Sequence, residues 1–178
     1  PSGRTIDTFV YDLTQTPTAN NFGNFTYTNM DEFKANAFGT DTIPAFVNYV
    51  EGIYVGYKFY ETAAAEGLID YDKTVVYPFG RGLSYTTFTQ TLNSVTEADG
   101  TITVDVTVTN TGSASGKEVV EVYYNPPYTN GGIEKASANL IGFAKTSELA
   151  PGASENVTVT FKAEDMASYD TYGKGCYV

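Results

Sequence analysis

The acid–base groups of this 178-residue chain are carboxylates, lysines and tyrosines, because the chain contains no histidine and a single cysteine, Cys176. Without histidine it cannot by itself form a Ser-His-Asp or Cys-His nucleophilic site, or a zinc site with histidine ligands. One cysteine cannot form an internal disulfide or a thiolate metal site. The catalytic chemistry open to the chain alone is therefore mainly that of paired carboxylates.

Two pairs of carboxylates have the residue types that cleave glycosidic bonds. Glu51 and Glu61 flank a helix candidate, and Asp7 and Asp12 lie near Arg4 in the sequence. A retaining glycosidase needs two carboxyl groups about 5–5.5 Å apart across a sugar-binding cleft. Nothing in the spacing brings any two of these groups to that distance. We therefore assign no catalytic residue and interpret these carboxylates as structural.

Other candidate ligand sites are explained better by local structure. Asp99-Gly100, close to Glu97, is a favoured hairpin dipeptide between two stretches that contain β-forming residues. The acidic residues within 66–72 lack the glycine-spaced loop of a calcium site, so we expect a solvated face. The sequence predicts no metal site and no cofactor.

Tyrosines are a possible platform for sugar rings, since aromatic faces stack on carbohydrate. The chain has no tryptophan, and tyrosines of a sandwich more often pack than bind. We interpret them as packing residues and leave the substrate-binding residues unassigned. The tyrosines considered are Tyr123, Tyr124, Tyr128, Tyr169 and Tyr172.

The net charge narrows the choice of partners. The chain has 21 acidic and 10 basic residues, a formal charge of -11, which argues against binding to nucleic acid or to an anionic membrane. No apolar run approaches the ~20 residues of a membrane span, and no signal-peptide pattern opens the chain. Hydrophobic residues make up 42% of the chain, enough for a folded core.

Two-residue alternation after residue 86 predicts a fibronectin type III or immunoglobulin-like antiparallel sandwich over residues 86–178. The clearest strand covers 101–109, and others are expected at 118–124, 140–145 and 156–161, with a last hairpin at 172–178. The segment has nearly the length of such a sandwich, about 100 residues. The side chains predicted to face its core are Ile102, Val104, Val106, Val108, Val157, Val159 and Phe161.

Residues 1–85 show no sustained period, which predicts a mostly irregular segment with one helix. We expect a strand at 5–11 and a helix at 50–66 that ends at Gly67 and buries a face formed by Ile53, Tyr57 and either Tyr60 or Glu61. Nothing in this segment closes a core of its own. We therefore expect it to be the end of a larger domain, and the chain to be a fragment.

Three strings carry a resemblance to a known family. They are PSGR at 1–4, VEGIYVGYKFYE at 50–61 and YPFGRGLSYTTF at 77–88. Their order and spacing resemble the C-terminal region of glycoside hydrolase family three, the β-glucosidase and β-xylosidase family. Residues 101–124, 140–152 and 165–170 are also similar to family strings. The resemblance implies that residues 1–85 are the C-terminal tail of an α/β sandwich domain with a linker. Residues 86–178 would be a fibronectin type III-like domain, whose last strand we expect to be truncated.

The resemblance implies a parent enzyme that hydrolyses O-glycosyl compounds, β-glucosides first and β-xylosides second. The family uses an aspartate nucleophile in a barrel domain and a glutamate acid/base in the α/β sandwich domain, and no residue here matches either motif. We expect a bacterial, soluble, non-catalytic portion that stabilises the catalytic domains and shapes the cleft rim. Its partners would be the barrel and α/β sandwich domains, and through them the substrate. The sequence leaves the compartment open between cytoplasmic and secreted. It also leaves two alternatives, a carbohydrate- or cell-wall-binding sandwich module and a structural spacer of a surface protein.

Overall fold

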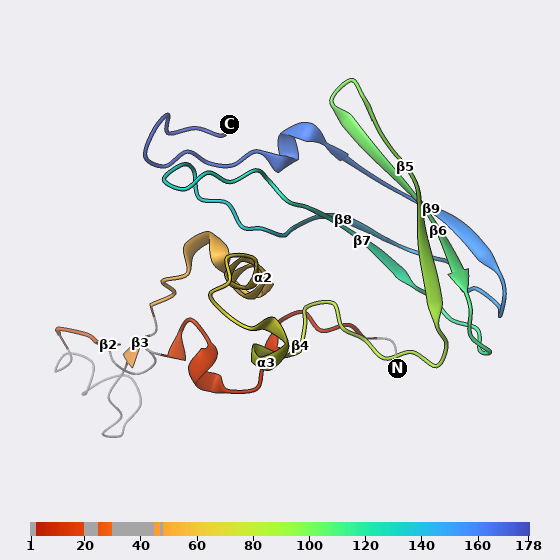
Figure 1. Cartoon of the computed structure of the whole chain (residues 1–178), viewed down its shortest axis with the longest axis horizontal. Coiled ribbons are helices and arrows are strands. Elements are labelled where there is room, and N and C mark those ends of the chain that lie inside the picture. The colour runs from red at the N-terminus through yellow and green to blue at the C-terminus, as the bar shows by residue number, and fades with distance from the viewer. Residues whose placement is uncertain (1–2, 20–24, 30–44, 47) are drawn as a thin grey trace. The chain divides into compact units, whose positions relative to one another are not determined.

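The computed structural model describes residues 3–19, 25–29, 45–46 and 48–178, and the chain divides into two compact units (Figure 1). The N-terminal unit comprises residues 7–78, and the sandwich unit comprises residues 79–178 together with the first six residues. The division therefore falls after residue 78 rather than after residue 85 as predicted, and the first residues belong with the later part of the chain. Pro1 and Ser2 of the PSGR string lie outside the described residues.

Backbone pairing explains why the chain start belongs to the sandwich unit. Thr5 N–H donates to the Arg81 carbonyl at 2.7 Å, and Gly80 N–H donates to the Thr5 carbonyl at 2.8 Å. Arg4 and Gly82 add an isolated antiparallel bridge. The stretch that we interpreted as a linker from the sequence is therefore one of two paired strands, and the other strand is the start of the chain.

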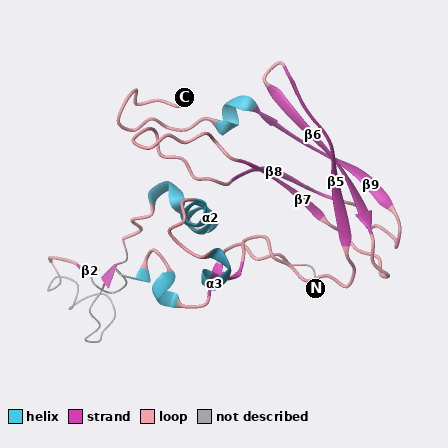
Figure 2. Cartoon of the chain, in the orientation of Figure 1, coloured by secondary structure: helices cyan, strands magenta, loops and turns pink. Residues whose placement is uncertain are grey.

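The sandwich unit contains two antiparallel sheets, shown in magenta in Figure 2. The first has the order β5-β6-β9, from β5 (Phe88–Ala98), β6 (Thr101–Asn110) and β9 (Ser154–Lys162). The second pairs β7 (Val119–Tyr124) with β8 (Asn139–Lys145). The strands expected at 101–109, 118–124, 140–145 and 156–161 are confirmed. The sequence prediction named no strand over 88–98.

The core of the sandwich follows the predicted alternation. Val104 and Val106 on β6 are each 6% exposed, and they pair with Val159 and Val157 on β9, which are also buried. Ile102 and Phe161 pack against this cluster and are partly buried. The seven predicted core residues therefore share one side of the sheet, and their threonine neighbours face the other way. This register is what a period of two imposes on a strand with one buried face.

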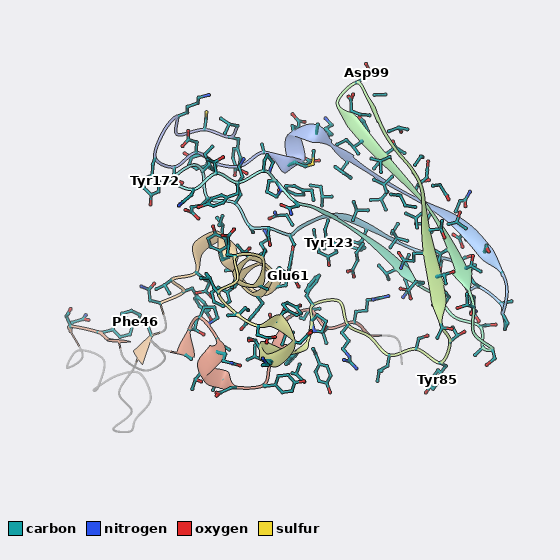
Figure 3. All side chains as sticks on the ribbon, viewed as in Figure 1. Phe46, Glu61, Tyr85, Asp99, Tyr123 and Tyr172 are labelled. Atoms are coloured by element: carbon teal, nitrogen blue, oxygen red, sulfur yellow. The ribbon has the colours of Figure 1, made fainter. Side chains whose placement is uncertain are left out.

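Asp99-Gly100 forms the predicted hairpin turn between β5 and β6, with Asp99 at the tip (Figure 3). Both residues have positive φ, 51° and 73°, as the favoured two-residue turn requires. Glu97 accepts a hydrogen bond from Gly100 N–H at 2.8 Å. These acidic side chains therefore belong to the turn.

The N-terminal unit is built from short elements. Among its described residues the strands pair as β1 with β4 and β2 with β3, and the helices are α2, α3 and two 3₁₀ turns. Their bounds are β1 (Phe9–Val10), η1 (Leu13–Gln15), β2 (Phe25–Thr26), β3 (Ala45–Phe46), η3 (Gly52–Tyr54), α2 (Tyr57–Ala65), α3 (Tyr71–Thr74) and β4 (Val75–Tyr77). The strand expected at 5–11 is confirmed only at Phe9–Val10, near its end, where β1 pairs with β4.

The helix predicted at 50–66 is shorter than expected. Gly56 has a φ of 64°, which ends the preceding 3₁₀ turn and starts α2 at Tyr57. Tyr60 is 4% exposed as predicted, but Ile53 lies in the separate turn and is half exposed, so its place on one helical face was wrong. The stop at Gly67 is confirmed by hydrogen bonds from Leu68 N–H to Ala63 O and from Gly67 N–H to Ala64 O.

Candidate functional site

Two of the four candidate carboxylates accept hydrogen bonds that serve local structure. Glu61 on α2 accepts from the Tyr71 hydroxyl at 2.6 Å (Figure 3). Asp12 accepts from Thr14 N–H at 2.9 Å and caps the first 3₁₀ turn. The bond from Thr14 N–H lowers the pKa of Asp12, because it stabilises the charged carboxylate. Burial, and then the Glu61 carboxylate, raises the pKa of Tyr71 above its ordinary value.

The other two candidates lie near a buried phenol. Burial raises the pKa of Tyr60, and the negative charges of Asp7 and Glu51 raise it further. Asp7 accepts from Thr8 N–H at 2.8 Å, whereas Oε2 of Glu51 is buried without a hydrogen-bond partner among the described residues. The structure thus brings Asp7 and Glu51 towards Tyr60, a grouping the sequence did not suggest. Tyr60 is almost fully buried, whereas Asp7 is exposed and Glu51 is partly buried, so the two carboxylates lie at the edge of the unit's interior.

Two further acidic residues, Asp70 and Asp170, also have structural partners. Asp70 caps α3 and forms a 2.6 Å ion pair with Lys73, which lowers the pKa of the Asp70 carboxyl. Asp170 accepts from Gly173 and Lys174 N–H at 2.8 Å, so its pKa is lowered as well. Within the described part of the chain, no three cysteine or acidic residues form a group that could hold a metal ion.

Arg4 is the charged residue that joins the chain start to the sandwich. Its Nη1 donates to the Gly80 carbonyl at 2.8 Å, and its Nη2 forms an ion pair with Glu118, the residue before β7. The linker passes so close that a Cβ at Gly82 would lie 3.0 Å from the Gly3 carbonyl oxygen. A Cβ at Gly80 would lie 2.9 Å from Glu121. The two glycines of the PFGRGLSY string therefore permit this close contact.

A cleft of about 230 Å³ opens beside Arg4, which we call the Arg4 cleft. Its walls carry three cationic side chains and one carboxylate, with no nucleophile and base pair of the kind that cleaves a covalent bond. Such walls can bind or anchor a polar segment. The lining residues are Gly3, Arg4, Gly82, Leu83, Ser84, Tyr85, Ser115, Gly116, Lys117, Glu118, Val119 and Lys145.

Known proteins that match the chain share both its sequence and its fold. Residues 118–178 match the model of the fibronectin type III-like domain. Beta-glucosidase A of Butyrivibrio fibrisolvens is 38% identical over 98% of the chain, and the chain spans 20% of that relative. The solved β-glucosidase of Paenibacillus barengoltzii has a TM-score of 0.76 and 35% identity over 99% of this chain and 17% of its own. The GH3 β-glucosidase of Bifidobacterium adolescentis has a TM-score of 0.72 and 29% identity over 99% of this chain and 22% of its own.

The chain corresponds to the C-terminal region of glycoside hydrolase family three. The resemblance of its three strings to that family is thereby confirmed, as is the mainly β sandwich fold. The chain spans about a fifth of the length of the first curated relatives, 20% of one and 15% of another. No helix of the described residues is long and apolar enough to span a bilayer.

Asn110 is a buried residue of this family three region that sequence reasoning treated only as part of a turn. It is completely buried at the end of β6 and makes four side-chain hydrogen bonds of 2.6–3.1 Å. Its oxygen accepts from Thr86 and Gly112, and its nitrogen donates to the Ala114 and Leu149 carbonyls. The sequence did contain a signal for this burial, because Asn110 follows the even-numbered residues of β6, whose side chains face the core.

The tyrosines of this family three region are more exposed than the packing interpretation requires. Tyr172 is 96% exposed and projects from the segment before the C-terminus (Figure 3). Tyr169 is half exposed and lies edge-to-face with Tyr177, with 5.3 Å between ring centroids. Tyr123 and Tyr128 are also exposed, and Tyr124 is partly buried. The packing interpretation is wrong for Tyr172 in particular.

Proposed function

We propose that the chain is the non-catalytic C-terminal portion of a retaining β-glucosidase that hydrolyses O-glycosyl bonds. The observation that carries the proposal is that similarity to β-glucosidases extends over almost the whole chain but over only about a fifth of the relatives. β-Xylosides are the second substrate class. The partners are the barrel and α/β sandwich domains of the parent polypeptide, which bring the β-glucoside or oligosaccharide substrate to the catalytic groups.

The N-terminal unit supports a role as the end of an α/β sandwich domain. The buried hydrophobic residues of its described part are Tyr60, Ala63 and Val75. Several large apolar side chains of the same unit are instead exposed, which is expected where a neighbouring domain would cover them. They are Leu13, Tyr49, Val50, Val55 and Leu68.

The sandwich unit supports a stabilising role. Its own core is centred on β6, and Arg4 and Thr5 attach it to the chain start just before the N-terminal unit. A folded module attached by two backbone strands and an ion pair holds that end of the α/β domain in place. The carboxylates near Tyr60 and on α2 have structural partners or are enclosed, and none is assigned a catalytic role.

The direct test is hydrolysis by the 178-residue chain and by the parent enzyme. We expect no turnover of an aryl β-glucoside or aryl β-xyloside by the chain alone above a heat-treated control. The parent polypeptide should hydrolyse the β-glucoside, and removal of residues 86–178 should lower its Tm. Turnover by the chain alone that disappears in Glu51→Gln or Asp7→Asn would overturn the proposal. An intact parent without activity on either substrate would overturn the enzyme assignment.

A carbohydrate-binding role is the second candidate, favoured by the exposed ring of Tyr172. Aromatic side chains that face solvent can stack on sugar rings. Titration of the chain with cello-oligosaccharides and soluble glucans should then shift the Tyr172 ring resonances and the backbone amides next to it. Tyr172→Ala should abolish the shift of those amides, whereas Tyr85→Ala, a change at an exposed linker tyrosine, should leave it unchanged. The absence of any shift at millimolar sugar rejects this role and leaves the first proposal intact.

A further inference from the structure

The Arg4 cleft gathers basic side chains in a chain that is otherwise acidic. Arg4, Lys117 and Lys145 line it, and Glu118 is the one acidic residue among its described walls. The chain as a whole has 21 acidic and 10 basic residues, so most of its surface carries the opposite charge. The cleft lies within the sandwich unit alone. A local excess of positive charge in such a protein favours an anionic ligand at this place.

The ion pair in the cleft leaves its two lysines uncompensated. Glu118 Oε1 accepts from Arg4 Nη2 and, at 3.2 Å, from the Gln90 side chain, so its negative charge already has partners inside the unit. The side chains of this ion pair are partly enclosed, 34% exposed for Arg4 and 17% for Glu118. Lys117 and Lys145 are exposed instead, and neither forms an ion pair with a described residue. The two ammonium groups are therefore available to a ligand.

Lys117 and Lys145 are neighbours on the outer face of the second sheet. Val119 of β7 pairs with Lys145 of β8, and Lys117 precedes Val119 by two residues, so the three side chains share one face. That face is the outer one, because Val120 is buried in the core. Like charges on neighbouring strands repel each other. An anion held between the two ammonium groups removes this repulsion.

The remaining walls of the cleft have groups that fit a sugar ring. Ser84 and Ser115 place hydroxyl groups there, and Ser84 Oγ accepts from Thr86 N–H at 3.3 Å, which leaves its own O–H to donate. Tyr85 is 81% exposed at the end of the linker, so its ring can pack on an apolar sugar face (Figure 3). The volume of about 230 Å³ is sufficient for one sugar residue.

We propose that the Arg4 cleft is a non-catalytic binding site for a uronic acid residue of a saccharide. The carboxylate lies between Lys117 and Lys145, the ring packs on Tyr85, and the ring hydroxyls bond to the serine hydroxyls. The proposal goes beyond the hydrolytic role of the parent enzyme and does not depend on it. It also differs from the neutral sugar binding considered at Tyr172, because here the carboxylate is the group that is recognised.

The charge of the whole chain restricts the ligand further. An acidic peptide or a nucleic acid would bring several negative charges against a protein of net charge -11. An acidic peptide would also leave the serine hydroxyls and the ring of Tyr85 unused. A single uronic acid in an otherwise neutral polysaccharide brings one charge and one ring. It is therefore the occupant that fits both the walls of the cleft and the surface around them.

The test compares two sugars that differ in one group. Methyl β-D-glucuronide has a carboxylate where methyl β-D-glucoside has a hydroxymethyl group. In the 178-residue chain at low salt, millimolar glucuronide should shift the amide resonances of 84–85 and 116–119, and the glucoside should not. Acetate offers the carboxylate without the ring, so it should bind at least about fivefold more weakly. Higher salt should weaken glucuronide binding, because the charges are exposed.

Paired variants separate the lysines of the cleft from the charge of the chain. Lys117→Gln with Lys145→Gln should weaken glucuronide binding about tenfold or more, since two charge-assisted hydrogen bonds are lost. The Tm should stay nearly unchanged, because neither lysine has an ion-pair partner among the described residues. Lys162→Gln with Lys174→Gln removes the same charge elsewhere in the sandwich unit and should leave the affinity within about twofold.

A change at the tyrosine separates the sugar ring from the carboxylate. Tyr85→Ala should weaken the glucuronide about fivefold and leave acetate binding unchanged, whereas Tyr85→Phe should retain the affinity for the glucuronide. In the parent polypeptide, the changes at Lys117 and Lys145 should weaken glucuronide binding by the same factor. They should leave kcat for the aryl β-glucoside unchanged, because the cleft takes no part in hydrolysis.

Three results would overturn the proposal. They are equal shifts with the glucuronide and the glucoside, equal affinities for acetate and the glucuronide, and a lysine variant that binds the glucuronide as tightly as the original chain. None of them affects the hydrolysis assays of the chain and the parent enzyme. The failure of this proposal and that of the proposed function are therefore distinguishable.

Discussion

The sandwich unit and the N-terminal unit differ in where their stabilising contacts lie. β6 has a strand partner on each side and buries Val104, Val106 and Val108 in a core made by the same unit. The described strands of the N-terminal unit are two or three residues long, and its longest helix there, α2, has nine. A sequence with a regular period can close its own core, whereas one without it depends on contacts from outside.

The largest expected loss of stability, and so the strongest test of this contrast, comes from placing a charge in the sandwich core. Val106→Asp should lower the free energy of unfolding of the sandwich unit by about 3–5 kcal/mol, as an uncompensated buried charge does. Chemical denaturation followed by exchange of β6 amides measures it. Thr160→Asp on the exposed face of β9 is the control and should cost about 0.5 kcal/mol or less. Equal effects of the two variants would show that the assigned core face is wrong.

The buried amide at the end of β6 is the next test of the same unit. Asn110→Ala leaves the Ala114 carbonyl and the Thr86 hydroxyl without their partner and removes one of the two hydrogen bonds to the Leu149 carbonyl, so we expect a loss of about 3 kcal/mol. Thermal and urea unfolding measure the loss. Asn156→Ala removes an exposed hydrogen bond to Thr107 and is the matched control. A loss no larger than that of the control would mean that the Asn110 network contributes little.

A smaller effect is expected in the N-terminal unit, where local backbone geometry ends the main helix. Gly67 has a φ of 70° with open space around its Cβ position, so Gly67→Ala should cost only the conformational penalty, about 1–2 kcal/mol. Gly67→Asn should recover much of the loss, because asparagine tolerates this conformation. Exchange of the α2 amides measures both. An alanine variant as stable as the original would contradict the helix stop.

The smallest expected effect is on the stability of the N-terminal unit at alkaline pH, and it is absent at neutral pH. The pKa of Tyr71 is raised in the folded state, by burial and by Glu61. The unfolded chain therefore ionises first, and the stability of the N-terminal unit should be constant below about pH 10 and fall as the pH rises further. Tyr71→Phe should reduce this fall, and Tyr172→Phe, a change at an exposed tyrosine in the other unit, should not. Urea unfolding between pH 8 and 11 measures it, and identical slopes for all three proteins would reject the assignment.

The sequence was informative where conformation is decided by neighbouring residues. The period of two along 101–109 predicted which side chains of β6 are buried, because every second residue of a strand points to the same face. Asp99-Gly100 predicted a turn and Gly67 predicted a helix end, since both depend on the positive φ that these residue types tolerate. The strings at 50–61 and 77–88 also indicated the family, because a short run of neighbouring residues in a fixed order can be recognised without knowing the fold.

Only the tertiary structure decided contacts between residues far apart in the chain. The pairing of Thr5 with the linker moved the division between the units, and Asp7 approaches Tyr60 although more than fifty residues separate them. Leu92 and Val95 are three residues apart, and a bulge between Leu92 and Ser94 puts both on the face of the β6 valines, yet they are exposed because no described element covers them. Local patterns specify which face of an element is apolar, but what covers that face is determined by how the elements assemble.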